Sequence, residues 1–136
     1  MEKNIQGLLK MQNLCFSEMS VSRNVEYFGK VEANVLFDIE YKKLAEKSVR
    51  VVISLQIKGQ GDLCVKMCEQ ADFELVNAEI LDADIQLSML KANTVAIMLP
   101  YLRSQVSLLT TQPGMAPIQL PIYNAVELTK NLTLNI

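Results

Sequence analysis

Residues 48–58 read SVRVVISLQIK, in which apolar and polar side chains alternate. Every second position from Val49 to Ile57 is valine, isoleucine or leucine, and the positions between them are polar apart from Val52. Successive side chains of a β-strand point to opposite faces, so this period of two predicts a strand with one buried face. Because the other face is polar, an antiparallel sheet is expected.

The same period continues on both sides of this strand. Val31–Tyr41 carries apolar residues at its odd positions, and only a short polar segment follows it, which predicts a hairpin. Residues 59–62 (GQGD) predict the next turn, after which Leu63–Leu75 resumes the alternation. An earlier strand is expected at Leu8–Val21. Together the four strands predict an antiparallel meander.

Beyond these strands the hydrophobic period becomes helical. Asp82 and Asp84 are good N-cap residues, and Asn93 offers a second cap. Spacings of four and three then produce one apolar stripe, made of Val95, Leu99, Leu102, Val106 and Leu109.

The predicted long helix has a kink and an end. Pro100 removes one helical hydrogen bond and is expected to bend the helix, which the sequence at 112–114 (QPG) then ends. A short last helix is expected from about Tyr123 to Asn131. The predicted fold class is therefore α+β: a four-stranded antiparallel meander with a long helix and a short C-terminal helix packed on one face.

The long helix is apolar over a wider arc than covering a sheet requires. Met98, Tyr101 and Leu108 form a second stripe beside the first. One face can cover the sheet, and the other then needs a second protein, which indicates an oligomer. A helix buried deeply within a monomer is the alternative.

Length and composition limit the possible functions. With 136 residues, 50% of them apolar, the chain is expected to form a single domain, residues 1–136. The sequence has no histidine, which excludes Ser-His and Cys-His nucleophile pairs and the commonest zinc sites. The paired carboxylates Asp38 and Glu40 are typical of a solvated sheet face, and nothing in this pattern demands a raised pKa for either of them. We expect no enzyme, no catalytic residue, no metal and no cofactor.

Charge and cysteine content bear on partners and location. A net charge of −2 without a basic cluster argues against nucleic acid. Residues 104–126 carry no charge, but their prolines and polar residues argue against membrane insertion. The first residues lack the apolar region of a signal peptide, and three cysteines fit a reducing compartment, so a cytoplasmic location is expected.

Several apolar residues lie where loops are expected. Tyr27 and Phe28 fall in the connection after the first strand, and the segment 115–123 is neutral and rich in proline. Methionine, with 7 residues, is adaptable enough to suit promiscuous apolar surfaces. This pattern favours a groove for extended nonpolar segments, with ordinary core packing as the alternative.

The segment Leu99-Pro100-Tyr101-Leu102-Arg103 resembles a family pattern. Followed by Gly114-Met115-Ala116-Pro117 and Leu120-Pro121, it is similar to the helix and proline loop of SecB, the bacterial protein-export chaperone. The order of the elements agrees as well. The resemblance implies a homotetramer, a dimer of dimers, that acts as an ATP-independent holdase. Such a holdase binds nonnative precursor polypeptides in apolar grooves and passes them to the motor SecA.

The resemblance also suggests roles for particular residues. The expected client-binding residues are Tyr27, Phe28, Met115, Ile118, Ile122, Tyr123 and Val126. The expected residues of the oligomer interface are Met98, Tyr101, Gln105 and Leu108. Glu18 aligns with one acidic position that contacts the motor.

The chain also departs from the SecB pattern. The family's aromatic-x-Gly-x-Phe is Glu69-Gln70-Ala71-Asp72-Phe73 here, and the acidic tail that helps to engage SecA is replaced by neutral residues. Relatives of SecB guard the antitoxin of a toxin-antitoxin pair, so a dedicated chaperone for one antitoxin or other single partner is an alternative function. A carrier of apolar small molecules, with its pocket between sheet and helix, is another. Homodimer and homotetramer both remain open.

Overall fold

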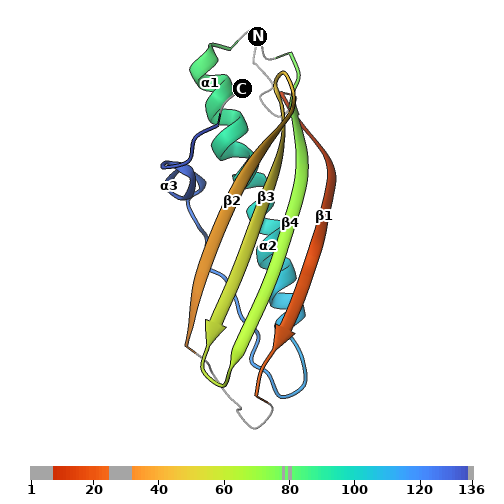
Figure 1. Ribbon diagram of the computed structural model, residues 1–136, viewed down its shortest axis with the longest axis vertical. Helices are drawn as coiled ribbons and strands as arrows, with labels where there is room; N and C mark the ends of the chain where they lie inside the picture. Colours follow the sequence, from red (N-terminus) through yellow and green to blue (C-terminus); the bar gives the residue numbers. More distant parts are fainter. Residues whose placement is uncertain (1–7, 25–31, 78, 80, 135–136) are drawn as a thin grey trace.

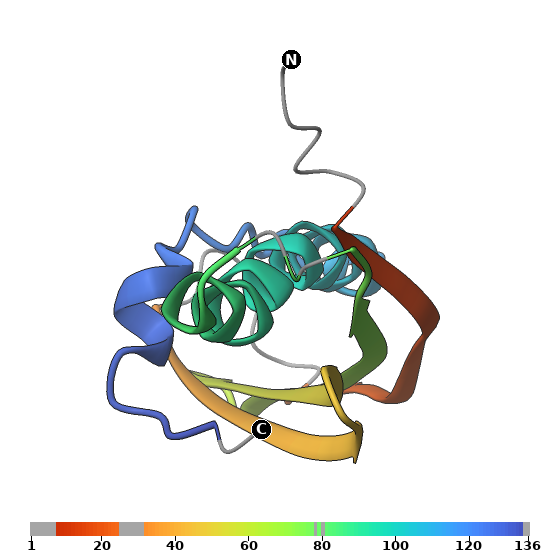
Figure 2. The same ribbon diagram turned by 90° about the horizontal axis from the view of Figure 1, so that it is seen from above.

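The computed structural model describes residues 8–24, 32–77, 79 and 81–134. Its four strands are β1 (Leu9–Ser22), β2 (Ala33–Ala45), β3 (Ser48–Gly59) and β4 (Leu63–Leu75). They are followed by α1 (Ala83–Ser88), the π-helical turn η3 (Met89–Asn93), α2 (Thr94–Thr110) and α3 (Ala125–Thr129). The predicted α+β class is confirmed, with the helices on one face of a single antiparallel sheet (Figures 1 and 2).

The strand order is β1-β4-β3-β2, so only β2, β3 and β4 form a meander. The first strand pairs with β4 and lies at the far edge from β2, which corrects the expectation of a meander through all four strands. The connection between Ser22 and Ala33 is longer than a hairpin loop. Pairing with β4 sets Leu9 opposite Leu75 and Met11 opposite Phe73, which extends the apolar inner face of the sheet.

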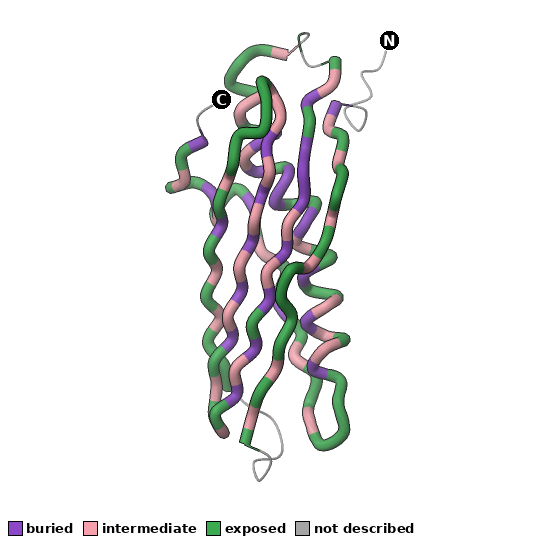
Figure 3. The backbone as a smooth tube through the Cα atoms, turned by 45° about the vertical axis from the view of Figure 1, so that its right-hand side comes forward, coloured by how far each residue is buried: buried purple, intermediate pink, exposed green. Residues whose placement is uncertain are grey.

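The core lies between the inner face of the sheet and the helices. The alternation predicted for β3 is confirmed, since its residues from Val49 to Ile57 are buried at every second position (Figure 3). Above them, α2 packs over β4 and β1. Its completely buried apolar residues are Val95, Met98, Leu102 and Val106. Among the described residues, no helix is long and apolar enough to cross a membrane.

The long helix begins where the sequence predicts. Asp82 accepts a hydrogen bond from the Ile85 amide at 2.9 Å through its side chain, as an N-cap does. A second start at Asn93 is wrong, because the backbone continues from η3 into α2 and the Asn93 side chain caps nothing. Pro100 lies within α2, and Gly114, at a φ of 74°, turns the chain away just beyond its end.

Candidate functional site

The segment 111–124 follows α2 and leads to α3, and we call it the strap. Its three prolines lack amide donors and prevent regular structure. Buried Thr110 fixes it near its beginning, because the Thr110 hydroxyl accepts a hydrogen bond from the Ile118 amide at 2.8 Å. Arg23, just after β1, donates to the carbonyl oxygens of Gly114 at 2.6 Å and Pro113 at 3.3 Å. The strap is thereby held against the end of the sheet.

The far end of the strap is anchored by an aromatic contact and a helix cap. The ring of Tyr123 meets that of Phe37 edge to face, with centroids 4.8 Å apart. Partial burial raises the pKa of Tyr123 above its usual value. The Asn124 side chain then accepts hydrogen bonds from the amides of Val126 at 2.9 Å and Glu127 at 3.3 Å, which starts α3.

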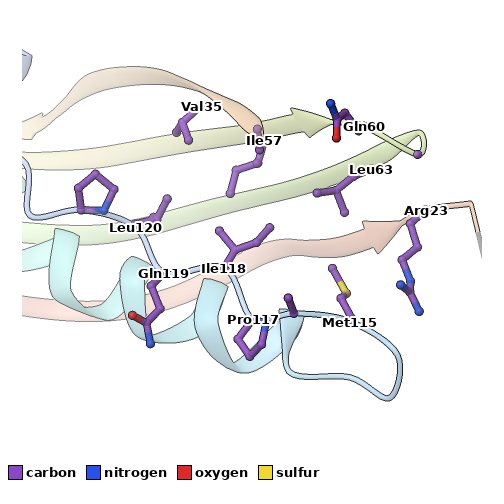
Figure 4. A pocket seen from close by; sticks show the side chains of 14 residues that line it. Arg23, Val35, Ile57, Gln60, Leu63, Met115, Pro117, Ile118, Gln119 and Leu120 are labelled. Atoms are coloured by element: carbon purple, nitrogen blue, oxygen red, sulfur yellow. The ribbon is translucent and has the colours of Figure 1, made fainter. Parts of the chain in front are cut away.

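A groove of about 320 Å³ lies between the strap and one end of the sheet, where β2 and β4 begin and β3 ends. We call it the sheet-side groove (Figure 4). Its floor comes from inward-facing sheet residues, including Val35, Ile57 and Leu63. Met115 and Ile118 of the strap form the opposite wall. The lining is therefore mainly apolar.

A second groove, of about 170 Å³, lies on the other side of the strap, against α2. Leu99 and Pro100 line it from the helix, and Ile122 and Tyr123 line it from the strap. Leu120 and Pro121 line both grooves, so the second, which we call the helix-side groove, adjoins the first. One strap thus presents apolar side chains to two neighbouring grooves.

The structure brings together four of the seven predicted client-binding residues. Met115 and Ile118 line the sheet-side groove, whereas Ile122 and Tyr123 line the helix-side groove. Ile122 is 87% exposed, which is unusual for a large apolar side chain. Val126 is exposed on α3 and lines neither groove, while Tyr27 and Phe28 lie outside the described residues.

The predicted oligomer residues do not form a single surface. Met98 is completely buried under α2, since it faces the sheet, and this corrects its assignment to an interface. Gln105 is half-buried, and Tyr101 and Leu108 are exposed. Ile97, which sequence reasoning missed, is exposed one helical turn before Tyr101. We call Ile97, Tyr101 and Leu108 the exposed α2 stripe; their spacing was visible in the sequence.

Two arginines that sequence reasoning did not treat as site residues line the grooves. Arg23 lies at the sheet-side groove, and Arg103 at the helix-side groove. Arg103 belongs to the segment that resembles SecB, which was the available signal. No local pattern marked Arg23, because its role depends on contacts with residues far along the chain.

Glu69 is a buried carboxyl group in the apolar core. The side chain has no exposed surface, and neither carboxyl oxygen has a hydrogen-bond partner. It lies between Phe16 of β1 and Ile53 of β3 in the sheet register. Desolvation raises the pKa of Glu69, a residue that sequence reasoning did not single out, to about 8.

The outer face of the sheet is polar by comparison. Glu18 is exposed there and pairs in register with Cys68. Arg50 and Asp72 form a salt bridge at 2.7 Å, and Asn13 donates to the same carboxylate at 3.0 Å, so three strands are joined. The described residues include no cluster of three or more histidine, cysteine or acidic side chains that could hold a metal ion.

Comparison with known proteins relates this architecture to one solved fold. No family model and no curated protein sequence matches the chain. A SecB-like chaperone from Mycobacterium tuberculosis, solved in complex with a ChAD peptide from the HigA1 antitoxin, aligns with a TM-score of 0.67 over 88% of this chain and 90% of that one. The two sequences are 15% identical. The chain has the SecB-like fold.

A protein of unknown function from Streptococcus agalactiae also aligns, at 16% identity over 84% of this chain and 97% of that one, with a TM-score of 0.39. The four-stranded sheet, followed by one long and one short helix, matches the fold of the SecB-like chaperone and the order of elements that the sequence resemblance implies.

Proposed function

We propose that this SecB-like chain is an ATP-independent holdase that binds nonnative polypeptides along the strap. The observation that carries the proposal is the pair of adjoining apolar grooves on either side of Leu120 and Pro121. The likeness to a SecB-like chaperone that was solved with a bound peptide supports it. The proposed client-binding residues are Met115, Ile118, Ile122 and Tyr123, with Val126 as an exposed extension on α3.

The energetics need no catalytic residue. Burying apolar surface contributes about 25 cal/mol per Å², so a few hundred Å² of client contact offsets the cost of ordering the client chain. The strap is held by Arg23, Thr110 and Tyr123, so the grooves exist before a client arrives. A preformed apolar groove binds by shape and hydrophobicity, which suits clients of unrelated sequence.

The test is suppression of aggregation by the purified chain. We expect an equimolar amount to reduce light scattering from an unrelated protein diluted out of denaturant. Ile122→Ser should weaken this effect because it removes the most exposed apolar side chain of the strap. Leu44→Ser is the control, since Leu44 is also exposed but lies near the end of β2, away from the residues that line either groove. Unchanged aggregation with the unmodified chain would contradict the proposal.

A dedicated chaperone for one antitoxin is the second candidate. The observation that favours it is the antitoxin peptide in the complex of the Mycobacterium tuberculosis protein. A dedicated chaperone should protect its own partner at concentrations that leave unrelated clients aggregating. Equal protection of several unrelated clients would favour the general holdase instead.

We propose further that the working form is a homodimer or homotetramer in the cytoplasm. The exposed α2 stripe supplies apolar surface for contact between copies. A link to protein export through SecA belongs to the same proposal, with Glu18 on the outer sheet face as a contact. Loss of SecA binding on Glu18→Lys, measured by calorimetry, would support that role, and an unchanged affinity would remove it.

The apolar small-molecule carrier is a weaker alternative. It needs a cavity between the sheet and α2, where Ile53, Met67 and Leu102 are buried side chains of the core cluster. The two grooves described above lie beside the strap instead. Lipid recovered with the purified chain and identified by mass spectrometry would revive this function.

A further inference from the structure

The charged residues that line the two grooves are both arginines. Arg23 lines the sheet-side groove, and Arg103 lines the helix-side groove. The strap between them adds no charge, since residues 104–126 contain none. No acidic side chain is among the described residues that line either groove.

This lining contrasts with the rest of the chain, whose net charge is −2. The acidic residues nearest in sequence to the sheet-side lining are Glu32 and Asp62, which neighbour lining residues but do not line the groove. Glu127 of α3, the acidic residue that follows the helix-side lining in sequence, forms a salt bridge with Lys130 at 2.9 Å. The helix-side groove therefore presents a cation, Arg103, in an acidic molecule.

Arg103 is the better placed of the two to meet a ligand. It is exposed on α2 and makes no hydrogen bond or ion pair with any residue in the described part of the chain. Its neighbours in the groove lining are Pro100, Ile122 and Tyr123, which are apolar or aromatic. A carboxylate beside an apolar ligand segment could pair with this guanidinium in a bidentate manner.

Arg23 supports the strap. Its guanidinium donates to the carbonyl oxygens of Pro113 and Gly114. These bonds orient the side chain along the groove wall (Figure 4). Substitution of Arg23 would move the strap itself, so the test uses Arg103.

We infer that the helix-side groove selects extended apolar segments that carry acidic side chains, with one client carboxylate paired to Arg103. This inference rests on the proposed holdase function and specifies its clients. Apolar burial supplies affinity for any nonpolar segment, whereas charge complementarity supplies discrimination. A partly solvated ion pair changes the affinity about two- to fivefold, and a like charge at the same place weakens binding to a similar degree.

The experiment compares three labelled peptides by fluorescence anisotropy with the full chain. They share one apolar sequence, and at two flanking positions they carry glutamate, glutamine or lysine. We expect the glutamate peptide to bind about two- to fivefold more tightly than the glutamine peptide, because one of its carboxylates pairs with Arg103, and the lysine peptide to bind most weakly. At about 0.5 M salt the three affinities should converge, because screening acts on partly solvated pairs.

Two variants locate the charge that discriminates. Arg103→Gln should abolish the preference, so that the glutamate and glutamine peptides bind this variant with equal affinity. Lys66→Gln is the matched control, because it changes the net charge equally but lies exposed on the outer sheet face, where it should have no effect.

The possible outcomes separate the two proposals. If none of the three peptides binds, the holdase function itself is wrong. If the peptides bind with equal affinity, the holdase stands and acidic selectivity is overturned. A preference that survives in Arg103→Gln would overturn the role of Arg103.

Discussion

Glu69 is an ionisable residue at a position that strand β4 buries. Strand β4 alternates, so residues 67, 69 and 71 all face the helices, and position 69 points inward whatever side chain it carries. No cation in the described part of the chain pairs with this carboxyl group. Desolvation therefore keeps the group protonated at neutral pH.

The raised pKa predicts stability that falls as pH increases. Below the unfolded-state pKa of 4.5 the carboxyl is protonated in both states and costs nothing through ionisation. Between that value and the folded-state pKa of about 8, only the unfolded chain releases the proton. The free energy of unfolding should then fall by about 1.4 kcal/mol per pH unit and level off above the folded-state pKa.

Urea unfolding across this pH range checks the prediction with two variants. Glu69→Gln removes the titrating proton, so its free energy of unfolding should depend much less on pH. Glu18→Gln, a change at an exposed position of β1, should keep the slope of the unmodified chain. Parallel curves for the unmodified chain and Glu69→Gln would show that this carboxyl does not carry the dependence.

At the scale of elements, the strap depends on a hydroxyl group at the end of α2. The Thr110 hydroxyl donates to the Val106 carbonyl at 2.8 Å and accepts from the Ile118 amide at 2.8 Å. Both bonds involve a completely buried side chain. The end of the helix therefore fixes the loop that forms both grooves.

Thr110→Val should loosen the strap without changing the volume of the side chain. It leaves the Ile118 amide without its acceptor, at a cost of about 1–3 kcal/mol in the free energy of unfolding. Hydrogen exchange at Ile118 should accelerate, and peptide affinity should fall. Thr111→Val is the control, because the exposed Thr111 hydroxyl donates to the Ser107 carbonyl of α2. Equal exchange at Ile118 in both variants would exclude this anchoring role.

For the whole molecule, the exposed α2 stripe is an apolar surface that the rest of the chain leaves open to solvent. Leu108 is 66% exposed, and Ile97 and Tyr101 lie on the same side of the helix. On the opposite face of the molecule, Leu36 of β2 is 61% exposed. Substitutions of these two leucines, which are exposed to a similar degree, can therefore compare the two faces of the molecule.

We predict that Leu108→Glu shifts the solution mass toward the monomer, because a charge buried in an apolar contact is costly. Leu36→Glu should leave the mass unchanged. Sedimentation equilibrium of the unmodified chain and both variants measures this directly. A monomer before any substitution, or dissociation by Leu36→Glu alone, would rule out the α2 stripe as the interface.

The sequence predicted the elements better than their contacts. Alternation of side chains marks β3 because burial of one face is a local property with a fixed period. The N-cap at Asp82 could likewise be predicted from the sequence. In contrast, the apolar positions of α2 form more than one stripe, and the sequence could not tell that Met98 faces the sheet while Ile97 faces solvent. The rotation of α2 over β4 and β1 made that choice.

In the candidate site too, residues with a local pattern could be predicted, whereas those placed by distant contacts could not. The neutral strap with its prolines is a local pattern, so Met115, Ile118, Ile122 and Tyr123 could be selected as groove residues before their positions were known. Arg23 could not, since it reaches the strap only because β1 ends beside Gly114. Glu69 falls on the apolar phase of its alternating strand, but the sequence could not show that the helices would cover this carboxyl group completely.

By itself, the sequence determined the strands, the helices and the nonpolar strap, since each depends on the spacing of neighbouring side chains and on local backbone preferences. The tertiary structure alone decided that β1 joins β4, that Glu69 is completely covered and that two arginines flank the grooves. These outcomes depend on contacts between residues far apart in the chain. They follow from burying the largest apolar area at once, which no local pattern encodes.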